Sequence, residues 1–261
     1  MLNNGKFNDY AAINMDINLK SKLKPGYQAQ ADSCEEVNGI AVLLNKKFIT
    51  GDNEKYKKMY DWMSYGYDLV ETVVGKLKYG NTINTMRNAI ISKLEWRDNC
   101  SVLYVSTGTG KNLQFIPASV NKKTLDIVGA DISMGMLKKC KKKFGKQLNL
   151  SLINCCAEDL PFKDNEFDIV FHVGGINFFN DKKLAIQEMI RVAKKGTKIL
   201  IADETDLFIE HQYKKSGFTK KYFAGQSFDL TELEANIPDD VTEKNTELTW
   251  GDKFYCITFR K

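Results

Sequence analysis

The length and composition of the chain are those of one folded domain with a sizeable core. It has 261 residues, of which 43% are hydrophobic and 27% charged, and a formal net charge of +5. No apolar run approaches the ~20 residues that span a bilayer, and the N-terminus lacks the basic start and apolar stretch of a secretory signal. We therefore expect a cytoplasmic protein with no membrane span.

The basic and sulfur-containing residues argue against two kinds of binding site. The basic excess is almost entirely lysine, whereas sites that recognise nucleic acids favour the guanidinium group of arginine. The six cysteines show no C-x-x-C spacing, which is typical of a reduced protein without a bound metal. We expect neither a nucleic-acid partner nor a metal site.

Two regions precede the centre of the chain. Residues 1–50 begin with a polar stretch, and we expect them to form a variable, loose segment. Over residues 51–95, apolar side chains such as Tyr56, Met59 and Tyr60 recur at three- and four-residue steps. This periodicity predicts a helical cap, with a second helix near residues 82–94.

The remaining residues, 96–261, alternate between predicted strands and predicted helices. Strands are expected near 101–106, 125–131, 148–154, 167–173 and 197–203, and helices near 111–118, 133–144, 181–194 and 206–216. Such alternation predicts a doubly wound α/β fold with a mostly parallel sheet. Two β-rich runs, 241–251 and 253–261, meet at Gly251 and predict a hairpin. The sheet would then have seven strands, with the last strand antiparallel.

The first strand of this region runs directly into a glycine-rich turn, VLYVSTGTG at 102–110, and Asp131 follows about twenty residues later. Gly108 and Gly110 can adopt positive φ and let a ligand approach the main chain. The spacing does not fit a phosphate-binding Walker loop, and Leu113 stands where a dinucleotide fingerprint needs Gly or Ala. S-adenosylmethionine, which has no phosphate, remains as the ligand, and a plain strand-turn-helix is the alternative.

Four blocks of the chain resemble a known family in order and spacing. They are VLYVSTGTG at 102–110, VGADISMGML at 128–137, CCAEDLPFKDNEFDIVF at 155–171 and EMIRVAKKGTKILIADE at 188–204. The family is that of the class I S-adenosylmethionine-dependent methyltransferases, with a Rossmann-like fold, and the closest branch is that of the ubiquinone and menaquinone C-methyltransferases. The likeness covers about residues 56–261.

The chain departs from the family pattern at several positions. The family usually reads VLDxGCGTG, so its acidic residue falls on Tyr104, its first glycine on Ser106 and its cysteine on Thr107. It usually reads GDAExLPF, so its aspartate falls on Cys156. Tyr104 cannot act as a carboxylate toward the ammonium group of the cofactor, although a phenol can accept one hydrogen bond.

The resemblance and the rule that ligands bind beyond the carboxyl ends of parallel strands together predict the site residues. The predicted cofactor-binding residues are Tyr104, Ser106, Thr107, Gly108, Gly110, Asp131, Ile132, Met134, Cys156, Ala157, Glu158 and His172. The predicted acceptor pocket contains Tyr60, Tyr65, Gly175, Asn177 and Phe178. His172 is the candidate catalytic base, with a structural histidine whose hydrogen bonds are satisfied as the alternative.

The expected function is transfer of a methyl group from S-adenosylmethionine to a small-molecule acceptor by in-line displacement, with S-adenosylhomocysteine as the product. Two alternatives stay open. One is a catalytically inactive binding protein that keeps the methyltransferase fold, and the other is an RNA or protein methyltransferase. The protein is expected to be a monomer or a homodimer. The acceptor atom is left open, because the sequence does not identify it.

Overall fold

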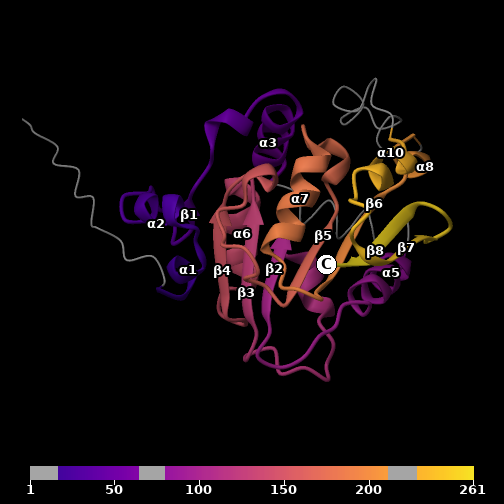
Figure 1. The fold of residues 1–261 in the computed structure, drawn as a ribbon, viewed down its shortest axis with the longest axis horizontal. Helices are drawn as coiled ribbons and strands as arrows, with labels where there is room; N and C mark the ends of the chain where they lie inside the picture. The colour runs from indigo at the N-terminus through magenta and orange to yellow at the C-terminus, as the bar shows by residue number, and fades with distance from the viewer. Residues whose placement is uncertain (1–16, 65–79, 211–227) are drawn as a thin grey trace, which may run out of the picture.

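The computed structural model describes residues 17–64, 80–210 and 228–261. Its centre is one eight-stranded sheet with the order β1-β4-β3-β2-β5-β6-β8-β7 (Figure 1). The strands are β1 (Ala41–Val42), β2 (Ser101–Val105), β3 (Asp126–Asp131), β4 (Leu150–Asn154), β5 (Ile169–Val173), β6 (Lys198–Glu204), β7 (Thr242–Thr249) and β8 (Phe254–Arg260). The predicted α/β fold is confirmed. The seven expected strands are joined by an eighth, β1, which pairs with β4.

The strand directions also agree with the prediction. Strands β1 to β6 are paired in parallel, whereas β8 is antiparallel to both β6 and β7. Strands β2 and β5 are buried along their whole length, as expected for parallel strands covered on both faces. Their neighbouring positions bring the carboxyl ends of β3, β2 and β5 side by side at one edge of the sheet.

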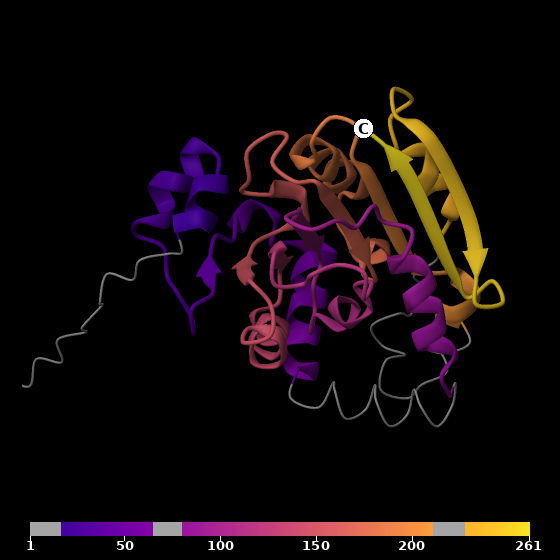
Figure 2. The same ribbon diagram turned by 90° about the horizontal axis from the view of Figure 1, so that it is seen from below.

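Helices cover both faces of the sheet. On one face lies α7 (Lys182–Val192), with Ile186 and Met189 in the core, together with the short helix α10 (Leu230–Ala235). On the other face lie α5 (Thr82–Ile91) and α6 (Met134–Phe144), which bury Ile90 and Leu137. Figure 2 shows these layers from below, with the β7–β8 hairpin at the end of the sheet opposite to α1 (Ile17–Lys22) and α2 (Pro25–Ala31).

Helix α6 shows how the sequence separates core from surface. It begins after Ser133, whose hydroxyl oxygen accepts a hydrogen bond from the N–H of Met136. Leu137, Cys140 and Phe144 follow at helical spacing and are buried against the sheet. The lysines between them, 138, 139 and 141–143, lie on the remaining face, which is exposed or half-buried.

The segment 17–50 differs from the loose arrangement that we expected for residues 1–50. Leu19, Leu23, Tyr27 and Ala31 recur at four-residue steps, and all four are buried in the main core. The chain is held there by a bridge between Leu23 and Phe162, and by Asp159, which accepts hydrogen bonds from the side chains of Lys24 and Tyr27. Leu19 lies in α1, Leu23 between the two helices, and Tyr27 and Ala31 in α2, and the polar start of the segment had concealed this pattern. The 3-10 turn η1 (Lys46–Phe48) follows β1.

Two predicted cap helices are present, α3 (Gly51–Met63) and α5. The carboxylate of Asp61 in α3 accepts hydrogen bonds from the Ser133 hydroxyl at 2.6 Å and from the Gly135 N–H at 3.0 Å. A side chain of the cap thereby ties α3 to the first turn of α6. Residues 65–79 between the two cap helices lie outside the described part of the chain.

Two predicted helices differ from the observed elements. Residues 111–118 were expected to be helical, but only the 3-10 helix η2 (Lys111–Phe115) forms, because Pro117 disfavours helical backbone at Ile116. Near 206–216 the structure describes α8 (Asp206–Phe208), and residues 211–227 lie outside the described part. No described helix is long and apolar enough to cross a membrane.

The packing of the N-terminal segment predicts a loss of stability on truncation of Leu23. Its side chain is fully buried, so Leu23→Ala should lower the free energy of unfolding by about 2–4 kcal/mol in urea denaturation. Ile17 is 80% exposed, so Ile17→Ala should change the free energy of unfolding by less than about 0.5 kcal/mol. Equal stability of the two variants would contradict this packing.

Candidate functional site

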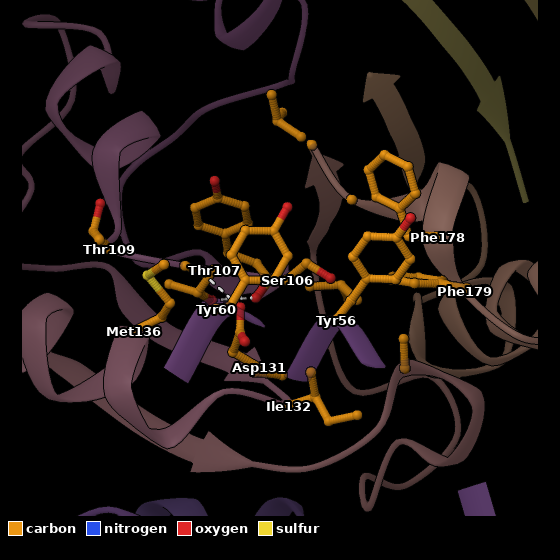
Figure 3. A pocket seen from close by; sticks show the side chains of 18 of the residues that line it. Tyr56, Tyr60, Ser106, Thr107, Thr109, Asp131, Ile132, Met136, Phe178 and Phe179 are labelled. Atoms are coloured by element: carbon orange, nitrogen blue, oxygen red, sulfur yellow. Dashed lines mark hydrogen bonds between the residues drawn. The ribbon is translucent and has the colours of Figure 1, made fainter. Parts of the chain in front are cut away.

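A pocket lies at the carboxyl ends of β2, β3 and β5, beside α3 (Figure 3). Its lining comes from the turn after β2, the end of β3, the segment after β4, the loop after β5, the end of β6 and the two cap helices. Side chains from distant parts of the sequence therefore meet at the edge where parallel sheets bind ligands.

The turn after β2 adopts the left-handed backbone conformation that the sequence predicted. Ser106, Gly108 and Gly110 have φ values of 53°, 56° and 75°. A Cβ atom on Gly108 would have no neighbour within 4 Å, so the pocket can bring a ligand against this main chain. A Cβ atom on Gly110 would lie 2.6 Å from Cys140 Sγ and 2.9 Å from Phe144 Cδ2. Gly110 is therefore needed for packing against α6, and it does not line the pocket.

Asp131, at the end of the neighbouring strand β3, binds the main chain of this turn. One carboxylate oxygen accepts a hydrogen bond from the Gly108 N–H at 2.8 Å, and the other accepts one from the Ser133 N–H at 2.8 Å. Burial raises the pKa of Asp131 to about 6, against the opposing effect of these N–H donors. The carboxylate thus lies in the pocket beside the open main chain of Gly108.

Tyr104 takes part in a chain of polar contacts below the turn. It is almost fully buried, and its ring stacks on Phe171 with centroids 4.3 Å apart. Its hydroxyl oxygen accepts a hydrogen bond from the amide of Asn112, whose carbonyl oxygen accepts one from Arg87 Nη1 at 2.8 Å. The acceptor capacity that the sequence assigned to the phenol is thus engaged within the protein.

Three residues after β4 were predicted to bind the cofactor, and two of them line the pocket. Ala157 and Glu158 line the pocket, and Glu158 accepts a hydrogen bond from Asn53 Nδ2 of α3 at 2.8 Å. Burial raises the pKa of Glu158. Cys156 is 1% exposed and lies outside the lining, and burial raises the pKa of its thiol to about 12. Its side chain does not take the place that the family pattern suggested.

The loop after β5 forms an aromatic side of the pocket. Gly174 and Gly175 have φ values of 89° and 114° and lead into the 3-10 helix η4 (Ile176–Phe178). Phe178 lies beside Tyr56 of α3, with ring centroids 4.5 Å apart (Figure 3). The lining there consists of Tyr56, Tyr60, Phe178 and Phe179.

Asn177 was predicted to shape the acceptor pocket, but its side chain forms hydrogen bonds within the protein. Its side-chain amide donates to the carbonyl of Glu204 at 2.8 Å, and its carbonyl oxygen accepts from the Tyr255 hydroxyl at 3.0 Å. Asp203 accepts hydrogen bonds from the N–H groups of Gly175 and Asn177 at 2.9 and 3.2 Å. Asp203 thus holds the glycine turn, while the side chain of Asn177 is bound to β6 and β8 and does not line the pocket.

His172, the predicted catalytic base, lies inside β5. Its side chain is fully buried, faces Phe179 edge-on at 5.5 Å, and is outside the pocket lining. Burial lowers the pKa of His172 to about 3, so the ring stays neutral and is a weak base. The ring lies within β5, and neither of its nitrogens has a hydrogen-bond partner among the described residues, so it is not the satisfied structural histidine of the alternative either.

The predicted residues divide into three groups. Those that line the pocket are Tyr60, Tyr104, Ser106, Thr107, Gly108, Asp131, Ile132, Ala157, Glu158, Gly175 and Phe178. Those that the structure places outside the lining are Gly110, Met134, Cys156, His172 and Asn177. Tyr65 lies outside the described residues.

Known proteins resemble the chain in sequence and in fold. A family model described as a methyltransferase domain matches residues 103–201. A ubiquinone/menaquinone biosynthesis C-methyltransferase of Wigglesworthia glossinidia brevipalpis is 30% identical over 188 residues, 71% of this chain and 70% of that protein. The ubiquinone/menaquinone biosynthesis C-methyltransferase of Geotalea daltonii is 28% identical over 202 residues, which are 75% of this chain and 83% of that protein.

The chain belongs to the S-adenosylmethionine-dependent methyltransferases. The crystal structure of a family member from Aquifex aeolicus has the same fold, with a TM-score of 0.54 at 16% identity. The superposition covers 72% of this chain and 96% of that one.

Several residues that line the pocket were not predicted from the sequence. They include Asn53, Tyr56, Arg87, Lys111, Asn112, Met136 and Glu204. Tyr56 could have been found, because it lies one helical turn before Tyr60 on the same face. Met136 lines the pocket in place of the predicted Met134, which packs beside the core. Arg87 had no local signal, since no sequence pattern specifies where its helix lies relative to the turn.

The two glycines of the turn should respond differently to alanine. Gly110→Ala should lower the free energy of unfolding by about 2–4 kcal/mol, because the new methyl group would overlap Cys140 and Phe144 at positive φ. Gly108→Ala should cost only about 1 kcal/mol, the strain of positive φ in open space. Urea denaturation of both variants measures this difference, and the reverse order of stability would show that the packing is misassigned.

Proposed function

We propose that this enzyme binds S-adenosylmethionine along the turn after β2 and transfers its methyl group to a small, flat, largely apolar molecule held at the aromatic side of the pocket. The observation that carries the proposal is the open main chain at Gly108 beside the buried carboxylate of Asp131. A nucleoside needs close approach to a backbone and an acceptor for its ribose hydroxyls, and these two groups supply both.

Each part of the cofactor has matching residues in the lining. Asp131 would accept hydrogen bonds from the ribose hydroxyls, and Ile132 and Ala157 would flank the adenine. When bound, S-adenosylmethionine supplies a methyl group on a sulfonium ion, which is already an activated leaving group. The protein residues then have to align the acceptor and exclude water.

The aromatic residues of the pocket suit that task. Tyr56, Tyr60, Phe178 and Phe179 come from two elements and present ring surface to a bound molecule. Glu204 ends β6 in the same lining and is the residue that we assign to take a proton if the acceptor must lose one. This role replaces the one that the sequence suggested for His172.

The relatives support an acceptor of this kind. The similar proteins from Wigglesworthia and Geotalea are named as ubiquinone/menaquinone biosynthesis C-methyltransferases. We extend this to a small aromatic acceptor and a cytoplasmic enzyme, monomeric or homodimeric, that acts on no nucleic acid. The lysine-dominated basic excess agrees with that proposal.

The raised pKa of Asp131 predicts how cofactor affinity depends on pH. Hydroxyl groups donate best to the ionised carboxylate, and protonation removes that form below about pH 6. The affinity for S-adenosylhomocysteine should therefore be highest above pH 7 and fall by up to about tenfold per pH unit below pH 6. Isothermal titration between about pH 5 and pH 8 measures it.

Asp131→Asn is the control for this pH dependence. It removes the titrating group, so its weaker affinity should be nearly independent of pH over the same range. Asp203, whose pKa burial also raises to about 6, stays in the variant and lies outside the lining. A pH slope that survives in Asp131→Asn would contradict the placement of the ribose.

The aromatic side of the pocket is tested by methyl transfer. With labelled S-adenosylmethionine and a panel of hydroxylated aromatic acceptors, Tyr60→Ala should raise the KM for the acceptor about threefold to tenfold and leave the Kd for S-adenosylhomocysteine unchanged. Trp62→Ala, on the same helix but 60% exposed and outside the lining, should change neither value. Transfer to no member of the panel by a protein that binds the cofactor would contradict the proposed acceptor class.

A further inference from the structure

Helix α3 is capped by a side chain from a distant part of the sequence. Thr50, which precedes the helix, is a residue type that commonly caps its own helix, but its side chain makes no capping hydrogen bond. The side-chain oxygen of Asn180 instead accepts hydrogen bonds from the N–H groups of Asp52 and Asn53, at 2.9 and 3.3 Å. Asn180 thus binds two of the four N–H groups that a helix leaves unpaired at its start.

The remaining polar groups of Asn180 strengthen this connection. Its side-chain nitrogen donates to the carbonyl oxygen of Thr50 at 2.7 Å, and its main-chain N–H donates to Asn53 Oδ1 at 3.4 Å. Gly51 permits the close approach, because its φ is 51° and a Cβ atom there would lie 2.9 Å from Asn180 Oδ1. The first turn of α3 is therefore bound by both the donors and the acceptor of one asparagine.

Asn180 lies next to both groups of aromatic rings in the pocket. It directly follows Phe178 and Phe179 in the sequence, and the turn of α3 that it binds is followed by Tyr56 and then Tyr60. The rings of Tyr56 and Phe178 face each other with centroids 4.5 Å apart. The contact between the two ring-bearing segments is thus adjacent to the hydrogen bonds of Asn180.

Other contacts attach α3 to the cofactor side of the pocket. The carboxylate of Asp61 accepts a hydrogen bond from the hydroxyl of Ser133 at 2.6 Å, and Asn53 Nδ2 donates to Glu158 at 2.8 Å. Neither bond involves the side chain of Asn180. Removal of that side chain should therefore leave α3 attached to the cofactor side.

We propose that Asn180 is a positioning residue for the methyl acceptor. By capping α3 from the loop after β5, it sets the separation between the tyrosine rings of α3 and the phenylalanine rings of the loop. A flat molecule binds tightly to such a surface only when the rings are already held where it needs them. Because these rings are the acceptor side of the pocket, this role rests on the proposed function.

The test measures the affinities of the full-length protein for two ligands. S-adenosylhomocysteine is titrated by calorimetry. The flat hydroxylated probe 2-naphthol is then titrated by fluorescence into protein saturated with S-adenosylhomocysteine. Asn180→Ala should weaken 2-naphthol about threefold to tenfold, as expected for loss of the capping bonds, and change the Kd of S-adenosylhomocysteine by less than about twofold.

A conservative variant and a matched control separate positioning from stability. Asn180→Asp keeps a capping oxygen at the helix start, so it should bind 2-naphthol within about twofold of the wild-type protein. Asp181 caps α7 by accepting from the N–H of Leu184 at 2.8 Å, and it lies outside the pocket lining. Asp181→Ala should lower Tm by about 2–4 °C, as Asn180→Ala does, and leave both affinities unchanged.

Four results would overturn this role while the proposed function stands. Unchanged binding of 2-naphthol by Asn180→Ala would show that the rings keep their separation without the cap. A loss as large in Asn180→Asp would show that the capping oxygen is not what matters. An equal loss in Asp181→Ala would show an effect of stability alone. Equal weakening of S-adenosylhomocysteine would show that Asn180 does not act on the acceptor side.

The wild-type protein distinguishes failure of this role from failure of the proposed function. If it bound S-adenosylhomocysteine but not 2-naphthol, the proposed aromatic acceptor and the role of Asn180 would fail together, and the cofactor site would stand. If it bound neither ligand, the proposed function would fail as a whole.

Discussion

The buried carboxylate of Asp131 is the contact on which the geometry of the pocket depends. Its two oxygens hold the main chain of the turn after β2 and the first residue before α6, each at 2.8 Å. Asp61 continues the connection, because it binds Ser133 and Gly135 and so brings α3 to the same place. Two carboxylates therefore join a strand end, a turn and two helices. The N–H donors offset part of the cost of burying the charge of Asp131.

The sequence predicted the fold and the turn because these depend on local patterns. Buried β-runs, alternation with helices and the glycine turn at 108–110 are visible within short windows. Asp131 was predictable for the same reason, since the tip of a parallel strand at that spacing lies beside the turn. The pattern that begins at Leu19 was equally local, and only the polar composition of the first residues obscured it.

Other residues could not be predicted because their role depends on contacts between distant segments. Asn177 looked like a pocket residue until Glu204 and Tyr255 were seen to bind its side chain. His172 lies near the end of β5, but its ring is fully buried and outside the pocket lining. Arg87 reaches the site from a helix whose position no sequence pattern specifies. Tyr104 looked like a lost contact, whereas the structure shows that its hydroxyl oxygen accepts a hydrogen bond from Asn112, which in turn accepts one from Arg87.

The outer edge of the sheet also has a consequence for assembly. Strand β7 is the terminal strand beyond β8, and it carries Glu243, Lys244 and Glu247 together with a shift of register between Thr242 and Asn245. Charged side chains and irregular pairing both discourage a foreign strand from adding to such an edge. At the other end, β1 is only two residues long and offers little backbone to a partner. Association of two copies by joining their sheets into one continuous sheet is therefore disfavoured, and so is edge-to-edge aggregation.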